Sequence, residues 1–156
     1  MSDKSQDCAE KVWSVLPTLM RTIAAYLRQQ EPRLDVTVWQ IMALKWLRGD
    51  SLTVGELARK FLVAPPTVTR LLDNLVERGL VERREDSEDR RRVRLLLTEK
   101  GEELFQELDR RALHCVEGIM VGLEPDEKER IVVAMNILQK ALERPSLVEQ
   151  RIAEHG

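Results

Sequence analysis

Residues 52–101, LTVGELARKFLVAPPTVTRLLDNLVERGLVERREDSEDRRRVRLLLTEKG, decide the fold of this chain. The first half of the stretch predicts two short helices joined by a tight turn. Thr53 is a good N-cap for the first helix, and Glu56 three residues later completes a capping box. Residues 62–63 then break the helical pattern, and the two prolines at 65–66 restart it, because proline is tolerated in the first helical turn.

The second of these helices has two different faces. Its apolar residues recur at spacings of three and four, and Gly79 is placed to close it. The apolar face consists of Val68, Leu71, Leu72, Leu75 and Val76, and the opposite face carries Thr67, Thr69, Arg70, Asp73 and Asn74. Two helices joined by about four residues, the second with a polar and basic exposed face, indicate a helix-turn-helix.

A charged hairpin is expected behind these helices. Residues 81–84 and 93–97 have the composition of paired strands, and residues 85–92, EDSEDRRR, are too charged to be buried. Residues 52–53 are expected to add a short third strand. The fold class is therefore mainly α with a small β-hairpin wing. In such a winged helix the second helix is expected to enter the major groove of DNA, and the wing is expected to reach an adjacent minor groove.

The same stretch resembles the MarR family of bacterial transcription regulators. The features that carry the resemblance are the TVTR sequence at 67–70, the GLV sequence at 79–81, the DRR sequence at 89–91 and the LTEKG sequence at 97–101. The resemblance implies a single MarR-like domain over residues 1–156, with the winged helix-turn-helix in residues 36–101. It also implies a sequence-specific DNA-binding regulator, a repressor, that acts in the cytoplasm.

The flanking sequence predicts further helices. Apolar periodicity places them over residues 9–30, 36–47, 99–121 and 125–142, and Pro17 is expected to kink or restart the first. Pro32 and Pro145 are expected to end helices, Thr37 and Thr98 to cap them, and Ser146 with Glu149 to begin a short last one.

These flanks hold more apolar surface than a small winged helix can cover, so self-association is expected. The resemblance implies that residues 5–31 and 102–156 interleave into a two-fold homodimer. Such a dimer places two recognition helices about one turn of DNA apart, so a pseudo-palindromic operator follows. The alternative is a monomer in which these helices pack within one chain.

The charge distribution favours DNA although the net charge does not. The chain carries a net charge of −2, but residues 59–94 hold ten Lys and Arg against seven Asp and Glu. A basic centre in an acidic frame is typical of a DNA-binding protein. The alternative interpretation is a solvated charged loop.

The resemblance assigns roles to individual residues. Arg91 occupies the place of a minor-groove arginine, and Asp89 that of a carboxylate that braces it. The other residues expected to face DNA are Thr67, Thr69, Arg70 and Asn74 in the major groove, Lys60 and Arg84 at phosphates, and Arg90, Arg92 and Arg94 at phosphate or solvent. For each of them the alternative is an ordinary solvated surface side chain.

One position departs from the family. MarR-like proteins usually have a capping serine near Ala64, and alanine followed by two prolines supplies neither a capping side chain nor two early N–H groups. Because a residue before proline avoids the helical region, we expect Pro65 at the N-cap and Pro66 at the first helical position.

An effector site is expected from the resemblance alone. MarR-like proteins often bind small aromatic acids or other anions between the dimer helices and the winged unit. The residues that could line such a cleft are Trp13, Arg21, Trp39, Met42, Trp46 and His114. The alternative is that they are core aromatic residues and surface polar residues.

Other functional classes have little support in the sequence. It contains no phosphate-binding glycine loop, no nucleophile elbow and no H-E-x-x-H motif, so neither an enzyme nor a cofactor is expected. Cys8 and Cys115 form no metal pattern, and no apolar run approaches the roughly 18 residues of a membrane span. With no signal peptide visible, a cytoplasmic protein is expected. A winged helix that binds protein is the alternative outside DNA binding.

A redox-sensing regulator of the same fold is a further alternative. Peroxide-sensing members of the family carry a reactive cysteine in the first helix, but we expect that position near Trp13 and not at Cys8. Cys115 falls on the apolar stripe of a long helix, where a buried thiol is inert.

Overall fold

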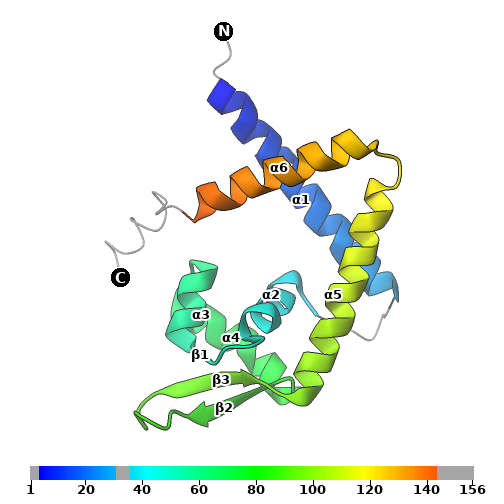
Figure 1. Cartoon of the computed structure of the whole chain (residues 1–156). Coiled ribbons are helices and arrows are strands. Elements are labelled where there is room, and N and C mark those ends of the chain that lie inside the picture. Colours follow the sequence, from blue (N-terminus) through cyan, green and yellow to red (C-terminus); the bar gives the residue numbers. More distant parts are fainter. Residues whose placement is uncertain (1–3, 31–35, 144–156) are drawn as a thin grey trace.

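The computed structural model describes residues 4–30 and 36–143, which form six helices and one small sheet (Figure 1). In chain order the elements are α1 (Lys4–Gln30), α2 (Val38–Leu47), β1 (Leu52–Thr53), α3 (Val54–Phe61), α4 (Pro65–Glu77), β2 (Val81–Glu85), β3 (Val93–Leu97), α5 (Glu99–Met120) and α6 (Pro125–Leu142). This confirms the mainly helical fold with a small wing. No helix within the described ranges is long and apolar enough to cross a membrane.

The sheet has three antiparallel strands in the order β1-β3-β2. Val81 pairs with Leu97 and Glu85 with Val93, so β2 and β3 form the expected hairpin. Leu52 pairs with Leu95, which confirms the short third strand. Leu95 faces the core and is fully buried, and this contact fixes the wing to the body of the protein.

Threonine caps begin three of the helices, as the sequence predicts. Thr37 caps α2 in a capping box with Gln40, and Thr53 caps α3 in a capping box with Glu56. Thr98 caps α5 by accepting a hydrogen bond at its hydroxyl from the backbone. Each cap satisfies amides that have no partner inside their helix, so the short helices of this region begin at defined residues.

The core lies between α2, α3, α4, the sheet and the first half of α5. It consists of Ala43, Leu44, Leu47, Leu52, Leu57, Ala58, Phe61, Val68, Leu72, Leu75, Leu80, Val81, Leu95 and Phe105. Burying these side chains provides most of the driving force for folding, at roughly 25 cal/mol per Å² of apolar surface. Residues of α4 and of the base of the wing share this core.

The start of α5 is docked directly on the end of α4. The hydroxyl of Thr98 donates to the carbonyl of Gly79 at 2.6 Å, and the ammonium of Lys100 donates to the carbonyl of Arg78 at 2.8 Å. Gly101 allows this approach, because a Cβ at that position would overlap the carbonyl oxygen of Leu80. The long helix α5 therefore leaves the winged unit in a fixed direction. It runs from the winged unit toward α1 and α6 (Figure 1).

Two helix starts differ from the expectation. The first helix begins at Lys4 and continues through Pro17 without restarting, because one proline removes one backbone donor and the turns on either side keep theirs. The second helix begins at residue 38, since Thr37 is its extended N-cap.

The expected positions of the two prolines in α4 were also wrong. Ala64 is the N-cap, with an extended backbone, and Pro65 and Pro66 occupy the first two helical positions. The amide of Thr67 donates to the carbonyl of Ala64 at 3.0 Å, so the first turn closes one residue earlier than expected. The restriction before proline is satisfied at Ala64, and the bias at Pro65 is overridden by this turn. The expected breaks at Pro32 and Pro145, and the last helix at Ser146 and Glu149, lie outside the described residues.

Candidate DNA-binding interface

The outer face of α4 is exposed and polar. Val68 and Leu72 point into the core and are at most 1% exposed, so the helical period turns Thr67, Thr69 and Arg70 outward. The hydroxyl of Thr69 donates to the carbonyl of Pro65 at 3.2 Å and keeps its acceptor lone pairs free. This face therefore offers a guanidinium and two hydroxyls close to the N-terminal end of the helix, where helix-turn-helix proteins contact bases.

Two further polar residues of α4 are held by other elements. Asp73 forms an ion pair with Arg83 of β2 at 2.8 Å, which neutralises a carboxylate on the exposed face. The Oδ1 of Asn74 accepts from Nε2 of Gln40 at 3.1 Å, and Oε1 of Gln40 accepts from the amide of Thr37 at 2.9 Å. Because the capping box fixes the amide of Gln40, one acceptor site of Asn74 is occupied and its amino group makes no hydrogen bond within the described residues.

The beginning of α4 lacks the donors that helix N-termini usually offer. Ala64 makes no side-chain cap, and Pro65 and Pro66 have no N–H groups. The departure from the family at this point is therefore present in the structure. The first turn therefore has fewer backbone donors to offer to a phosphate than most helix N-termini have.

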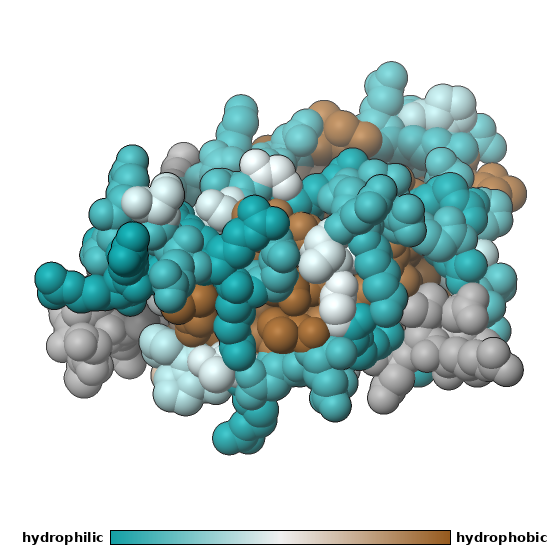
Figure 2. All heavy atoms as spheres, turned by 90° about the horizontal axis from the view of Figure 1, so that it is seen from below, coloured by the Kyte–Doolittle hydropathy of each residue, from teal (hydrophilic) through white to brown (hydrophobic). Residues whose placement is uncertain are grey.

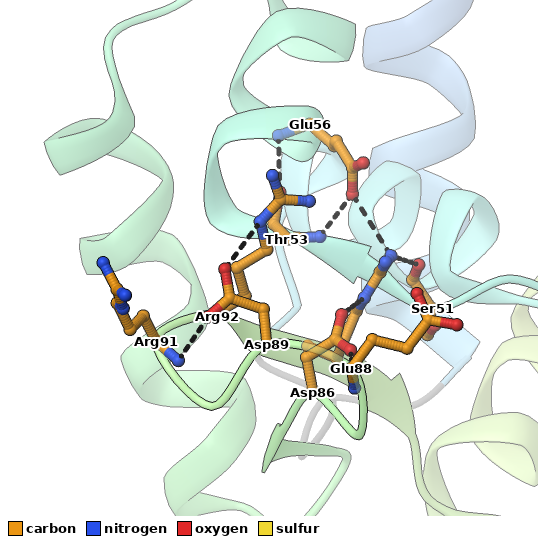
Figure 3. Close-up of polar contacts among 9 residues, drawn as sticks. Ser51, Thr53, Glu56, Asp86, Glu88, Asp89, Arg91 and Arg92 are labelled. Carbon is orange, nitrogen blue, oxygen red and sulfur yellow. Dashed lines mark hydrogen bonds and ion pairs between the residues drawn. The ribbon is translucent and has the colours of Figure 1, made fainter.

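The wing tip carries three exposed arginines, Arg90, Arg91 and Arg92. Asp89 does brace this tip, but its Oδ1 accepts from the backbone amide of Arg91 at 3.0 Å and not from the guanidinium (Figure 3). Its Oδ2 lies 3.7 Å from Nε of Arg92. Within the described part of the chain, the guanidinium of Arg91 forms no hydrogen bond or ion pair and points away from the turn.

The base of the wing is different, because Arg94 turns toward the protein. Its Nε lies 2.7 Å from Oδ2 of Asp86, and its Nη1 donates to the carbonyl of Ser51 at 3.0 Å. Hydrogen bonds from the amide of Glu88 and from Arg94 lower the pKa of Asp86. The sequence suggested phosphate or solvent as the partner of Arg94; the structure shows that packing across the sheet brings these acceptors to its guanidinium, while 31% of the side chain remains exposed.

The two expected phosphate contacts are exposed and have local partners. Lys60 at the end of α3 lies 6.0 Å from the ring centroid of Trp46, and Arg84 of β2 forms an ion pair with Glu82 at 2.6 Å. Both side chains remain accessible. Figure 2 shows the molecule from below, the side on which the hairpin lies in Figure 1, and there hydrophilic side chains surround a central apolar area.

The residues expected to line an effector cleft do not meet in one chain. Trp39 and Trp46 both pack on Phe61, with ring centroids 5.6 Å and 4.5 Å apart, and Met42 packs against the core. These three belong to α2, and its two tryptophans contact Phe61 of α3.

The remaining three lie elsewhere. Trp13 is 81% exposed on α1, and Arg21 is exposed further along the same helix. His114 is exposed on α5, where it lies 3.9 Å from Glu117. The six residues therefore lie on three helices, α1, α2 and α5.

One cavity places an aromatic residue beside the N-terminal half of α4. Its volume is about 440 Å³, and its lining residues are Thr37, Trp39, Gln40, Phe61, Val63, Thr67, Val68, Arg70 and Leu71. Sequence reasoning missed the contributions of Gln40 and Phe61. The capping-box spacing from Thr37 to Gln40 was visible in the sequence, but the partner of Gln40 on α4 was not.

Comparison with known proteins identifies the family. The family model described as MarR family matches residues 34–92. The chain is 39% identical over 95 residues to YsmB of Bacillus subtilis, an uncharacterized HTH-type transcriptional regulator, with 57% of this chain and 64% of YsmB covered. It is 32% identical to YfiV of the same organism, with 71% and 70% covered. It is also 32% identical to the transcriptional repressor MprA of Escherichia coli, with 70% and 61% covered.

The chain therefore spans less than two thirds of the length of YsmB and of MprA.

Solved structures agree in fold. Wild-type MarR of Escherichia coli in its apo form has a TM-score of 0.71 at 26% identity, over 86% of this chain and 96% of that one. FabT of Streptococcus pneumoniae in complex with DNA has a TM-score of 0.73 at 23% identity, over 92% and 100%.

A third structure concerns Bordetella bronchiseptica BpsR and the regulation of its DNA binding by 6-hydroxynicotinic acid. Its TM-score is 0.64 at 25% identity, over 82% of this chain and 92% of that one. The matches in sequence and in fold cover the winged helix-turn-helix described above and extend into the flanking helices. The chain belongs to the MarR family of winged helix-turn-helix transcription regulators, which are not enzymes.

Proposed function

We propose that this chain is a repressor that binds a pseudo-palindromic double-stranded DNA operator as a homodimer. The observation that carries the proposal is the pairing of two exposed features on one rigid base. Thr67, Thr69 and Arg70 project from α4, and Arg91 projects from the wing with its guanidinium free within the described residues. An arginine without an internal partner suits a narrow, negatively charged minor groove.

The proposed DNA contacts divide into two groups. Thr67, Thr69, Arg70 and Asn74 are assigned to the major groove, where Asn74 offers donors because Gln40 occupies its carbonyl oxygen. The remaining contacts are assigned to the minor groove and the phosphates: Asp89, Arg90, Arg91 and Arg92 of the wing, with Lys60 and Arg84. A regulator of bacterial operators acts in the cytoplasm, where this proposal places it.

The proposed dimer rests on apolar surface that the single chain leaves uncovered. The exposed large apolar side chains of the flanks are Trp13, Val15, Leu16 and Met20 near the first half of α1, Leu113, Ile119 and Val121 at the end of α5, and Val132, Val133, Met135, Ile137 and Leu142 on α6. Exposed apolar surface of this extent marks an interaction site in a soluble domain. A two-fold partner would cover it and would place the two copies of α4 for two half-sites.

The proposed effector is a small aromatic or anionic molecule. Trp39 lines the cavity beside Thr67 and Arg70, so a bound ring with an acidic group would compete with DNA for Arg70. BpsR, a structural neighbour, has its DNA binding regulated by 6-hydroxynicotinic acid. The repressor role is supported by MprA, a relative that is a transcriptional repressor.

Selection of genomic fragments with the purified full-length chain tests the proposal. Recovered fragments are expected to share a pseudo-palindrome, and affinity for it should fall steeply with salt, because several phosphates release counterions. Sedimentation should show a dimer. Arg70→Ala should weaken binding, whereas Arg110→Ala removes the same charge from an exposed side chain of α5, outside the proposed DNA contacts and outside the apolar residues assigned to the dimer, and should not.

Two other outcomes would favour other functions. A chain that captures no DNA but retains a winged fold would point to a protein-binding module. Release of DNA by hydroperoxide, reversed by a thiol reductant, would point to redox control. Cys8 of α1 is exposed and Cys115 of α5 is buried. These positions support redox control less strongly than the free guanidinium of Arg91 supports DNA binding.

A further inference from the structure

Arg94 of β3 joins three elements of the winged unit through one guanidinium. It pairs with Asp86 at 2.7 Å, it donates to the carbonyl of Ser51 at 3.0 Å, and its Nη1 lies 3.6 Å from Oε2 of Glu56. Only 31% of the Arg94 side chain is exposed. Ser51 directly precedes β1, Glu56 lies in the first turn of α3, and Asp86 directly follows β2. The guanidinium therefore ties the hairpin to the first helix of the helix-turn-helix.

Arg94 contacts α3 through Glu56, a residue that also caps this helix. The Oε2 of Glu56 accepts from the amide of Thr53 at 2.7 Å in the capping box of α3 (Figure 3). The same oxygen faces Arg94, so the cap of α3 and the anchor of the wing share one carboxylate.

The contact with Asp86 controls the wing tip. Asp86 is 9% exposed, its Oδ1 accepts from the amide of Glu88 at 2.9 Å, and its own amide donates to the carbonyl of Arg92 at 2.9 Å. It closes the turn that carries residues 87–91. Without Arg94 a nearly buried carboxylate would lose its cation, which is more costly than losing a surface pair.

Arg91 and Arg94 therefore have opposite surroundings within one hairpin. The guanidinium of Arg91 is exposed and free within the described residues, whereas that of Arg94 is held by three acceptors from separate elements. A flexible wing would have to be ordered when DNA binds, and that ordering would reduce affinity. A wing that is already fixed avoids this cost.

We propose that Arg94 is a positioning residue for DNA binding, which acts through the wing and does not touch DNA itself. It holds the tip so that Arg91 enters the minor groove while α4 occupies the major groove. This inference rests on the proposed function, because it assumes that the wing contacts DNA.

The first test uses the free full-length protein and needs no DNA. Hydrogen exchange of the amides of Asp86 and Arg92, which bond to Arg92 O and Asp89 O, is measured by NMR in wild type, Arg94→Gln and Arg84→Gln. Arg84 lies opposite Arg94 in the strand register and loses the same charge, so it is the matched control. Arg94→Gln should speed exchange at both amides by about tenfold, while core amides of α4 and exchange in Arg84→Gln stay unchanged. Equal protection in all three proteins would overturn the inference.

The second test is a double-mutant cycle on operator affinity. Arg94→Gln should weaken binding by about tenfold in the wild-type background but by less than about threefold when Arg91 is already alanine, because Arg94 acts through the tip. Equal losses in both backgrounds would mean that Arg94 acts independently of Arg91, which would refute its positioning role.

The third comparison separates positioning from a phosphate contact. Arg94→Lys keeps the charge but lacks the planar fork, so it should bind DNA nearly as weakly as Arg94→Gln, with a salt dependence like that of wild type. Wild-type affinity in Arg94→Lys, with a slope reduced by about one in Arg94→Gln, would identify a phosphate contact and overturn the inference. If wild type binds no DNA but the exchange result holds, the proposed function fails while the anchoring of the wing stands.

Discussion

The winged unit and the flanking helices contain similar apolar residues, but the winged unit buries them and the flanking helices leave many of them exposed. In the winged unit Leu44, Leu57, Leu72 and Leu95 are fully buried, whereas α6 buries none of its residues. Both regions have helical periodicity, although α2, α3 and α4 have only 10, 8 and 13 residues whereas α1, α5 and α6 have 27, 22 and 18. The difference is that three short helices and a sheet enclose a common centre, whereas α1 and α6 have apolar faces that this chain leaves open.

This contrast indicates which region folds by itself and which needs a partner. Helix α5 belongs to both, because its first half closes the core with Phe105 and its last turn exposes Ile119. A change in the position of the flanking helices would therefore reach the winged unit through the docked start of α5.

The largest effect is expected from deleting residues 1–30. The deletion removes the apolar seam of Leu16, Leu19, Ile23 and Leu27, so it should abolish both dimer and DNA binding. Sedimentation and operator binding measure the two losses. A truncated chain that sediments as a well-folded dimer would refute this prediction.

A point change on α6 sharpens that test. Ile137 is 64% exposed in one chain, so Ile137→Glu should leave the fold intact but dissociate the dimer, because a charge would be buried in the proposed contact. Gln139→Glu adds the same charge at another exposed position of α6 and serves as the control. Circular dichroism and sedimentation equilibrium separate the two effects, and an unchanged dimer in Ile137→Glu would place the interface elsewhere.

Two glycines of α5 compare its two ends directly. Gly101→Ala should destabilise the fold by about 3 kcal/mol, because the new Cβ would overlap the backbone of Leu80. Gly118→Ala meets nothing within 4 Å and should stabilise the helix by roughly 0.5–1 kcal/mol. Thermal unfolding checks both, and a destabilised Gly118→Ala would show that the far end of α5 is also packed.

Arg91→Ala should weaken operator binding by more than about tenfold at about 150 mM salt, because it removes the proposed minor-groove contact. Folding should be unaffected, since the guanidinium has no internal partner within the described residues. Anisotropy with a labelled operator duplex measures the affinity, and unfolding curves provide the control. Unchanged affinity would exclude the minor-groove role.

A smaller effect is expected from pH in the middle of α5. Hydrogen bonds from Arg110 and then Arg111 lower the pKa of Glu107 to about 2, from an ordinary value of 4.5. A group with a lowered pKa contributes stability above its unfolded pKa and loses it as the pH falls through the folded value. Stability should therefore decline between about pH 4.5 and pH 2, and Glu107→Gln should decline less steeply in this window. Thermal midpoints at stepped pH values measure both, and identical profiles would remove Glu107 as a contributor.

The smallest effect is expected at the cysteines. Wild type and Cys8→Ser should release DNA equally little under mild organic hydroperoxide, because Cys8 is exposed on α1 and Cys115 is buried on α5. Fluorescence anisotropy of the operator complex follows release. If only the wild type releases DNA, and a thiol reductant restores binding, the regulator is redox-controlled.

The sequence by itself determined the elements whose stabilising contacts are local. The caps at Thr37, Thr53 and Thr98 use partners three residues away, so spacing along the chain was enough to find them. The two faces of α4 and the strands of the wing follow from periods of 3.6 and 2. Such patterns also carried the resemblance to the family.

Only the tertiary structure decided which distant residues meet. Arg94 reaches Ser51 across 43 positions, and Gln40 reaches Asn74 across 34. These contacts depend on how α2, α3, α4 and the sheet pack around one core, and no local pattern encodes a partner that far away. The same packing separated the expected effector residues onto α1, α2 and α5, and it turned Arg94 inward while Arg91, three residues earlier, remained free to contact DNA.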